Sequence, residues 1–171
     1  MKQRIQKIAL LALDVDGVLT DGKIIYDSAG REIKQFDVHD GYGIVFFQRA
    51  GFKTAIITAR DSKVVTIRAK DLKINKLYQN AFPKIHAYKQ LLQNFKLKDE
   101  QVCFIGDDLL DIPILKRVGF AVAVPNAVEE VKKIAHYVTK KNGGSGAVRE
   151  VIDLILKTTG KWETIMVGLE E

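Results

Sequence analysis

An apolar segment that runs directly into two aspartates constrains this chain more than any other feature. Residues 8–13 are all apolar and are followed by the segment DVDGVLT at residues 14–20, a pattern that predicts a buried strand ending in Asp14 and Asp16. Unpaired charges at the end of a core strand cost several kcal/mol each. The two carboxylates therefore need a partner, and a hard divalent cation is the natural candidate. The glycine after Asp16 allows the backbone to turn sharply beside a ligand.

Composition limits the function classes. The length predicts one domain over residues 1–171. The sequence has no apolar run of about 18 residues or more, so no membrane contact is expected. The single cysteine, Cys103, cannot form an internal disulfide, which favours a reducing cytoplasm. The net charge is +6, but the basic residues are scattered without interleaved aromatics. We therefore expect an anionic small molecule as partner, and no nucleic acid.

Short apolar runs alternate with helical patterns, which predicts an α/β fold with a parallel sheet and crossover helices. The expected strands are residues 8–13, 54–58, 76–78, 102–105, 120–124 and 137–139. The expected helices are residues 41–50, 61–72, 84–95, 112–118, 128–134 and 147–158. Residues 22–37 break this pattern, because they form two short strand-like runs around a glycine-containing turn. We expect a β-hairpin there, projecting from the edge of the sheet where ligands bind.

Polar residues follow the predicted strands, at the edge where the carboxyl ends of parallel strands meet. These residues, with a lysine that begins a predicted helix, are Asp14, Asp16, Thr58, Lys84, Asp107, Asp108 and Asp111. The set suits phosphoryl transfer. One carboxylate can attack phosphorus, and a second can move protons. A hydroxyl and an ammonium can hold the phosphoryl oxygens, while Mg²⁺ offsets the repulsion between an anionic nucleophile and an anionic substrate.

The order and spacing of these motifs resemble the haloacid dehalogenase superfamily of phosphatases over nearly the whole chain. The resemblance implies a Rossmann-like parallel sheet flanked by helices, and it implies a role for each residue. Asp14 is the expected nucleophile and a Mg²⁺ ligand. Asp16 is the expected general acid/base and binds the metal through its carbonyl. Thr58 and Lys84 are the expected phosphate binders, and Asp107 is the third metal ligand.

Two further acids of the same motif, Asp108 and Asp111, are expected to orient Lys84 or a metal-bound water. The gaps between motifs also bear on the fold. About forty residues separate Asp16 from Thr58, whereas a cap domain needs on the order of 50 or more. We therefore expect a capless enzyme. Its site needs cover from a neighbouring subunit, the hairpin or the C-terminal tail, about residues 159–171.

The resemblance narrows to capless (C0) phosphatases of an eight-carbon keto-deoxy sugar acid, which act in lipopolysaccharide precursor synthesis. It covers residues 5–157 and rests on the hairpin and on the segments DGYG (40–43), ITAR (57–60) and GGSGAVRE (143–150). It implies hydrolysis of a small anionic sugar-acid phosphate through an aspartyl phosphate. It also implies a homotetramer in which neighbouring subunits complete each site. The substrate contacts that it implies are Asp16, Asp37, Val38, His39, Asp40, Gly41, Arg60, Arg68 and Lys84.

Three alternatives stay open at this point. Many relatives carry arginine where this chain has Val45, which widens the possible substrates to other small sugar phosphates. A sister group acts on nine-carbon sugar acids and has glutamate at the position of Arg60, so Arg60 favours the eight-carbon substrate. A receiver-like phospho-acceptor domain would need an aspartate after the third strand, where this chain has glutamine and asparagine. Arg149, after a glycine-rich loop, suits an anion contact and a helix start equally.

Overall fold

A parallel sheet of six strands, in the order β5-β4-β1-β6-β7-β8, forms the centre of this computed structural model, which describes residues 1–168. Its strands are β1 (Leu10–Leu13), β4 (Lys53–Ile57), β5 (Lys76–Tyr78), β6 (Val102–Gly106), β7 (Phe120–Ala123) and β8 (Tyr137–Val138). The chain proceeds outward from β1 to β5 and then crosses back to β6. The point where the strand order reverses therefore lies beside β1, where open α/β sheets bind their ligands.

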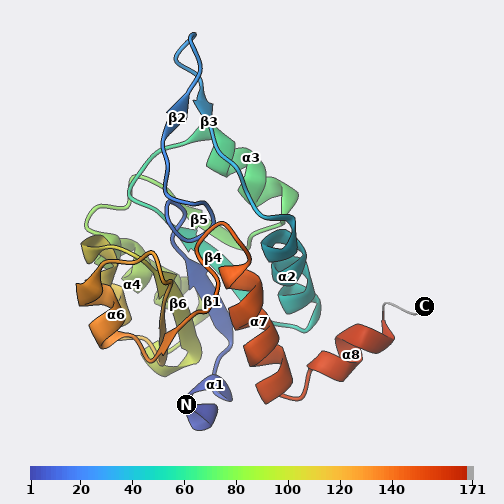
Figure 1. Ribbon diagram of the computed structural model, residues 1–171. Coiled ribbons are helices and arrows are strands. Elements are labelled where there is room, and N and C mark those ends of the chain that lie inside the picture. Colours follow the sequence, from blue (N-terminus) through green and yellow to red (C-terminus); the bar gives the residue numbers. More distant parts are fainter. Residues whose placement is uncertain (169–171) are drawn as a thin grey trace.

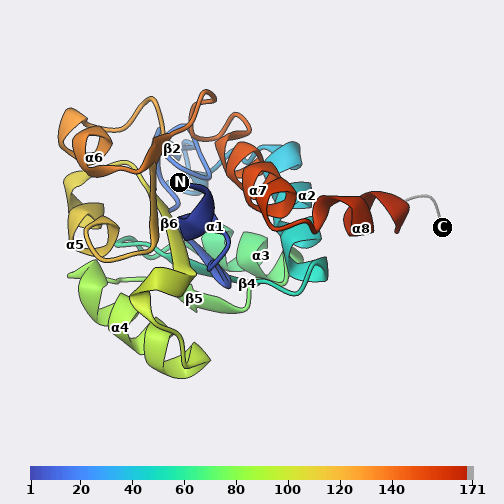
Figure 2. The same ribbon diagram turned by 90° about the horizontal axis from the view of Figure 1, so that it is seen from below.

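Helices cover both faces of this sheet. They are α1 (Lys2–Ile5), α2 (Val38–Arg49), α3 (Lys63–Asp71), α4 (Lys84–Phe95), α5 (Ile112–Leu115), α6 (Glu129–Ile134), α7 (Ala147–Thr158) and α8 (Trp162–Val167), with short 3₁₀ turns η1 (Asp99–Gln101) and η2 (Leu109–Asp111). In Figures 1 and 2, α2, α3 and α7 lie on one side and α4, α5 and α6 on the other. Right-handed crossovers produce this distribution, because the direction across the sheet reverses after β5. Among the described helices, none is long and apolar enough to cross a membrane.

The hairpin β2 (Ile25–Tyr26) and β3 (Glu32–Ile33) extends beyond the carboxyl end of the sheet, as predicted (Figure 1). Asp27 closes its turn, since Asp27 Oδ1 accepts hydrogen bonds from the backbone N–H groups of Ala29 at 2.9 Å and Arg31 at 2.8 Å. Between β1 and β4 the chain forms only this hairpin and α2. The predicted α/β fold without a cap domain is confirmed.

Several elements differ from the predictions, and the helix predicted at 112–118 ends at Leu115. Lys2–Ile5 forms a helical turn, so the first strand begins at Leu10 rather than residue 8. The helix predicted at 41–50 begins at Val38, because Asp37 caps it by accepting from the backbone N–H of His39 and Asp40. Helix α8 was not predicted. It packs on the core through buried Ile165, within the tail predicted as a possible lid; residues 169–171 of that tail lie outside the described residues.

Candidate active site

A buried lysine joins two aspartates at the carboxyl end of the sheet. Asp14 follows β1, Lys84 begins α4, and Asp111 ends η2. Lys84 Nζ lies 2.8 Å from Asp14 Oδ1 and donates to Asp111 Oδ1 at 2.7 Å. The side chains of Lys84 and Asp111 are 3% and 0% exposed. Burial alone would lower the pKa of Lys84, but the two carboxylates outweigh it and raise that pKa, so the ammonium stays charged.

A third carboxylate, that of Asp107, completes the cluster. Oxygen atoms of Asp14, Asp107 and Asp111 lie within 4.8 Å of one another. Burial, and then the neighbouring carboxylates, hold the pKa values of Asp14 and Asp107 well above their usual range. One ammonium cannot neutralise three carboxylates, so the cluster has the charge and the oxygen donors that a hard divalent cation requires.

The carboxylate oxygens differ in how many partners they already have. Asp111 Oδ1 accepts from Lys84, and its Oδ2 accepts from the backbone N–H of Asp107 at 3.0 Å and of Asp108 at 3.3 Å. Asp107 Oδ1 is buried without a hydrogen-bond partner in the described part of the chain. A buried, unpaired oxygen is costly unless a ligand completes it. Asp107 and Asp14 therefore suit a cation better than Asp111, which supports Lys84 instead.

Glycines bring the loop after β1 against this cluster. Gly17 has φ +90°, and a Cβ there would lie 1.9 Å from Asp107 Oδ2. A Cβ on Gly143 would lie 1.7 Å from the Gly17 carbonyl oxygen. Asn126 joins the two loops, because its Nδ2 donates to the Gly17 carbonyl at 2.9 Å and its Oδ1 accepts from Gly143 N–H at 2.8 Å. Any larger residue at either glycine would displace the loop that carries the two aspartates.

Asp16 points toward the hairpin rather than into the carboxylate cluster. Asp16 Oδ1 is paired with Lys34 Nζ, and Arg60 Nε lies 3.6 Å from Asp16 Oδ2. Glu32 of β3 binds Arg60 at 3.0 Å and accepts from the hydroxyl of Ser62. The predicted acid/base residue therefore lies in a network of charges that connects the hairpin to the loop after β4.

Lys34, Glu32 and Ser62 are not among the site residues predicted from the sequence. A pattern that points to the first two exists, since alternate residues of a strand share a face. Glu32 and Lys34 flank Ile33 in the second hairpin strand, so both project from the same side. The direction in which that side faces depends on how the hairpin folds over β1, which local alternation does not determine.

One cavity unites most of the predicted catalytic residues. It has a volume of ≈ 250 Å³ and is lined by Asp14, Asp16, Gly22, Thr58, Ala59, Arg60, Lys84, Asp107, Asp108 and Leu110. Thr58 ends up buried because it directly follows β4 at the switch point. The predicted nucleophile, acid/base, phosphate binders and metal ligands are thus adjacent in the folded chain.

The other predicted substrate residues lie elsewhere. Val38, Gly41 and Arg68 line a second cavity of ≈ 260 Å³ between α2 and α3, which Val45 also lines. The Arg68 guanidinium lies 5.4 Å from the centre of the Phe36 ring, and its Nε is buried without a partner in the described part of the chain. The structure therefore divides the predicted substrate contacts between two cavities of one chain.

Two of the other predicted contacts, Asp37 and Asp40, have structural roles in this chain. Asp37 caps α2, and His39 is exposed with its Nδ1 3.4 Å from an Asp37 oxygen. Asp40 is buried and accepts from the backbone N–H of Arg149 at 2.7 Å; burial raises its pKa to about 6. The Arg149 side chain turns away and binds Asp153 at 2.7 Å. Asp40 therefore anchors α7 against α2, and Arg149 lines neither of these two cavities.

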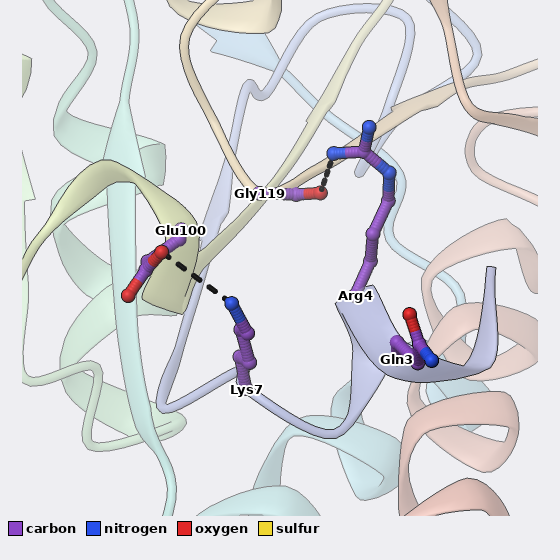
Figure 3. Close-up of a pocket in the computed structure, with 5 residues that line it drawn as sticks. All are labelled: Gln3, Arg4, Lys7, Glu100 and Gly119. Atoms are coloured by element: carbon purple, nitrogen blue, oxygen red, sulfur yellow. Dashed lines mark hydrogen bonds and ion pairs between the residues drawn. The ribbon is translucent and has the colours of Figure 1, made fainter.

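A further cavity of ≈ 320 Å³ lies at the amino ends of β6 and β7, lined by Gln3, Arg4, Lys7, Glu100 and Gly119 (Figure 3). Arg4 donates to the Gly119 carbonyl at 3.2 Å, and Lys7 pairs with Glu100 at 3.5 Å. Parallel sheets bind their ligands at the opposite ends of the strands. The cavity that contains Asp14 is therefore the candidate active site.

Comparison with known proteins agrees with this geometry. Residues 52–152 match the profile of haloacid dehalogenase-like hydrolases. The chain is 47% identical, over 94% of its length and 86% of the relative's, to the 3-deoxy-D-manno-octulosonate 8-phosphate phosphatase KdsC of Yersinia pestis. This chain belongs to the haloacid dehalogenase-like hydrolases. Membership in that family excludes the receiver-like alternative.

Solved structures of the same hydrolase family share the whole fold. The 3-deoxy-D-manno-octulosonate 8-phosphate phosphatase of Moraxella catarrhalis, in complex with magnesium ion, phosphate ion and KDO, is 40% identical with a TM-score of 0.95. That match covers 98% of this chain and 97% of the other. The cobalt-bound phosphatase of Haemophilus influenzae is 38% identical with a TM-score of 0.90 and covers 93% of each chain.

Proposed function

We propose that this protein is a Mg²⁺-dependent phosphatase that hydrolyses 3-deoxy-D-manno-octulosonate 8-phosphate to the free sugar acid and phosphate. This reaction contributes to lipopolysaccharide precursor synthesis, and we place it in the cytoplasm. The observation that carries the proposal is the buried carboxylate–lysine cluster of Asp14, Lys84, Asp107 and Asp111 beside Asp16. It occurs in a chain that is 47% identical to a phosphatase of this substrate.

The metal would be held by the side chains of Asp14 and Asp107 and by the backbone carbonyl of Asp16. Support comes from the unpaired, buried Asp107 Oδ1 and from the excess of carboxylates over ammonium groups in the cluster. Bound Mg²⁺ supplies positive charge that lets an anionic carboxylate approach an anionic phosphoryl group. Asp111 keeps Lys84 in place, so that Lys84 Nζ and the Thr58 hydroxyl can donate to the phosphoryl oxygens.

The residues support a two-step reaction. In the first step, a carboxylate oxygen of Asp14 bonds to phosphorus and the bond from phosphorus to the sugar oxygen breaks. That oxygen keeps the electron pair and takes a proton from the Asp16 carboxyl. In the second step, water attacks the phosphorus of the aspartyl phosphate and gives its proton to Asp16, while the bond from phosphorus to the Asp14 oxygen breaks and that oxygen keeps the electron pair. Phosphate then departs, and both carboxyl groups return to their starting states.

Arg60 is the residue best placed to select a sugar acid. Its side chain is 42% exposed in the cavity and lies beside Asp16. A guanidinium binds a carboxylate through paired hydrogen bonds, which a substrate without a carboxylate cannot form. A phosphatase of a nine-carbon sugar acid or of another small sugar phosphate is the alternative.

A comparison of substrates tests this assignment. We expect kcat/KM for the eight-carbon sugar-acid phosphate to exceed that for the nine-carbon one and for hexose phosphates by about 10-fold or more. Arg60→Met should reduce the ratio of kcat/KM for the sugar-acid phosphates to kcat/KM for hexose phosphates. Steady-state phosphate release measures all three substrates, with Arg49→Met, an exposure-matched arginine substitution on α2, as control. Equal kcat/KM values for every substrate would contradict the substrate assignment while leaving a general phosphatase.

We also propose a homotetramer in which a neighbouring subunit completes each active site. In the described chain, Val38, Gly41 and Arg68 line the second cavity and do not line the cavity of Asp14. The unpaired Arg68 Nε supports a ligand or partner at that surface. The Asp37–Gly41 segment of one subunit, through its exposed Val38 and His39, and Arg68 would then contact the sugar acid bound to another.

Mixed oligomers test the shared site. Asp14→Asn and Arg68→Ala should each be nearly inactive alone, and refolding them together should restore part of the turnover. Restoration requires that an intact Arg68 from one subunit serve an intact Asp14 in another. If the mixture is no more active than the two variants measured separately, then Arg68 acts in the site of its own subunit or has no role in the reaction. Light scattering on the same samples measures the assembly.

A further inference from the structure

The hairpin carries a buried lysine beside the predicted acid/base residue. Lys34 directly follows β3, and its side chain is 1% exposed. Its Nζ is paired with Asp16 Oδ1 and lies 3.3 Å from Glu32 Oε1. A buried ammonium is costly unless its partners compensate for the lost water. The two carboxylates do so here, which fixes the position of Lys34 relative to Asp16.

Contacts on the other side of Glu32 hold this pair against the body of the protein. Glu32 accepts from the hydroxyl of Ser62 and from Arg60 at 3.0 Å. Ser62 is the N-cap of α3, and its hydroxyl also accepts from Val65 N–H at 3.3 Å. Glu32 therefore connects Lys34 to the N-terminus of α3, so the hairpin is held against the body of the protein at this point.

The two oxygens of Asp16 have different surroundings. Lys34 engages Oδ1, whereas Arg60 Nε lies 3.6 Å from Oδ2, beyond the usual hydrogen-bond distance. Asp16 lines the active-site cavity. Oδ2 is thus the oxygen free to carry the proton. The χ2 torsion of an aspartate is otherwise broad, so an unheld carboxylate would sample other orientations.

We propose that Lys34 is a positioning residue that holds Asp16 so that Oδ2 faces the leaving oxygen of the substrate. The inference rests on the proposed function, in which Asp16 gives its proton to the sugar oxygen as the P–O bond breaks. Alignment of a reacting group within a narrow range of geometry carries much of the rate of such a step. Lys34 itself does not line the cavity of Asp14.

A change in leaving group separates positioning from a general structural role. An alkyl phosphate such as the sugar-acid ester needs a proton on its leaving oxygen, whereas 2,4-dinitrophenyl phosphate releases a stable phenolate without one. General acid catalysis contributes about 10²–10⁴-fold. For Lys34→Met we expect kcat/KM to fall about 10- to 100-fold with the sugar-acid phosphate and less than about threefold with the dinitrophenyl ester. KM for the sugar-acid phosphate should change little.

Four further variants complete the test. Asp16→Asn gives the reference profile for a lost acid, and Lys34→Arg should recover part of the rate because it keeps the charge. Glu32→Gln should change kcat/KM for the two substrates in the same direction as Lys34→Met, but by a smaller factor. It replaces Lys34→Met in the test if that variant does not fold. Lys23→Met is the control for loss of a hairpin lysine charge, at an exposed side chain that pairs with Asp21.

The positioning role would be overturned if Lys34→Met lowered kcat/KM equally for both esters and Lys34→Arg were as impaired as Lys34→Met. If Lys34→Met does not fold, equal losses for Glu32→Gln on the two esters overturn it as well. Failure of the proposed function has a different result, since the wild-type protein would then lack activity on the sugar-acid phosphate. In that case the ratio between an unactivated alkyl phosphate and the dinitrophenyl ester still tests Lys34.

Discussion

Replacing Asp14 by asparagine is expected to reduce turnover by at least about 10³-fold, as loss of a covalent nucleophile does in other enzymes. The same change should raise the thermal stability of the metal-free protein. Burial, and then the Asp111 carboxylate, raise the pKa of Asp14 from 3.8 to about 7. The ionised group is therefore unfavourable in the folded chain, and asparagine can keep the 2.8 Å contact with Lys84 without the charge.

The sign of the stability effect sets its pH dependence. A carboxyl whose pKa is raised on folding favours the folded state below that pKa, and this contribution is lost as pH rises from the unfolded value toward about 7. The gain of Asp14→Asn over wild type should thus be absent near pH 4 and largest above pH 7, as measured by melting temperature in EDTA. Asp21→Asn, at an exposed and paired carboxylate, is the control and should show no such gain.

Either of two results would contradict this prediction. Turnover of Asp14→Asn within about tenfold of wild type would remove the aspartyl-phosphate mechanism. A melting temperature of Asp14→Asn below that of wild type above pH 7 would mean that the Asp14 charge stabilises the folded protein. The burial of this carboxylate predicts the reverse. Acid quenching during turnover with labelled substrate adds a direct measurement, since only wild type should retain phosphate on the chain.

The acid cluster was predictable because it depends on topology alone. The carboxyl ends of parallel strands meet at one edge, so any acids placed there converge, whatever the details of the connecting helices. Asp14 and Asp107 follow the adjacent strands β1 and β6, and their proximity required no knowledge of side-chain packing. The long apolar runs of these strands also made the sheet itself predictable.

Contacts that depend on tertiary placement were not predictable. The pairing of Lys34 with Asp16 requires a hairpin whose strands are only two residues long to fold back over β1. Such short strands have too little alternation to fix their register or their inward face. The sequence also did not predict that Val38 and Arg68 line a different cavity of the chain from Asp14. A motif along the chain does not specify whether its residues serve one subunit or its neighbour.

Replacing Lys84 by methionine should destabilise the metal-free protein by about 3–5 kcal/mol, because it leaves Asp14 and Asp111 buried without their ammonium partner. Both carboxylates lie within 2.8 Å of Lys84 Nζ. The loss should grow as pH rises, since protonation of Asp14 at low pH removes one of the unpaired charges. Mg²⁺ should restore part of the stability, because it binds the same carboxylates and only the folded chain brings them together. Urea denaturation with EDTA or Mg²⁺ measures these differences.

Activity should fall as well, since a buried donor to the phosphoryl oxygens is worth about 10²–10³-fold in comparable sites. Mg²⁺ should not restore this part, because a cation that would be held by Asp14 and Asp107 cannot donate the hydrogen bond that Lys84 Nζ supplies. Lys89→Met, on the exposed side of the same helix α4, is the matched control and should alter neither property. Full recovery of turnover by Mg²⁺ in Lys84→Met would show that Lys84 serves only to offset the carboxylate charge. An unchanged urea midpoint without metal would instead show that Asp14 and Asp111 do not depend on it.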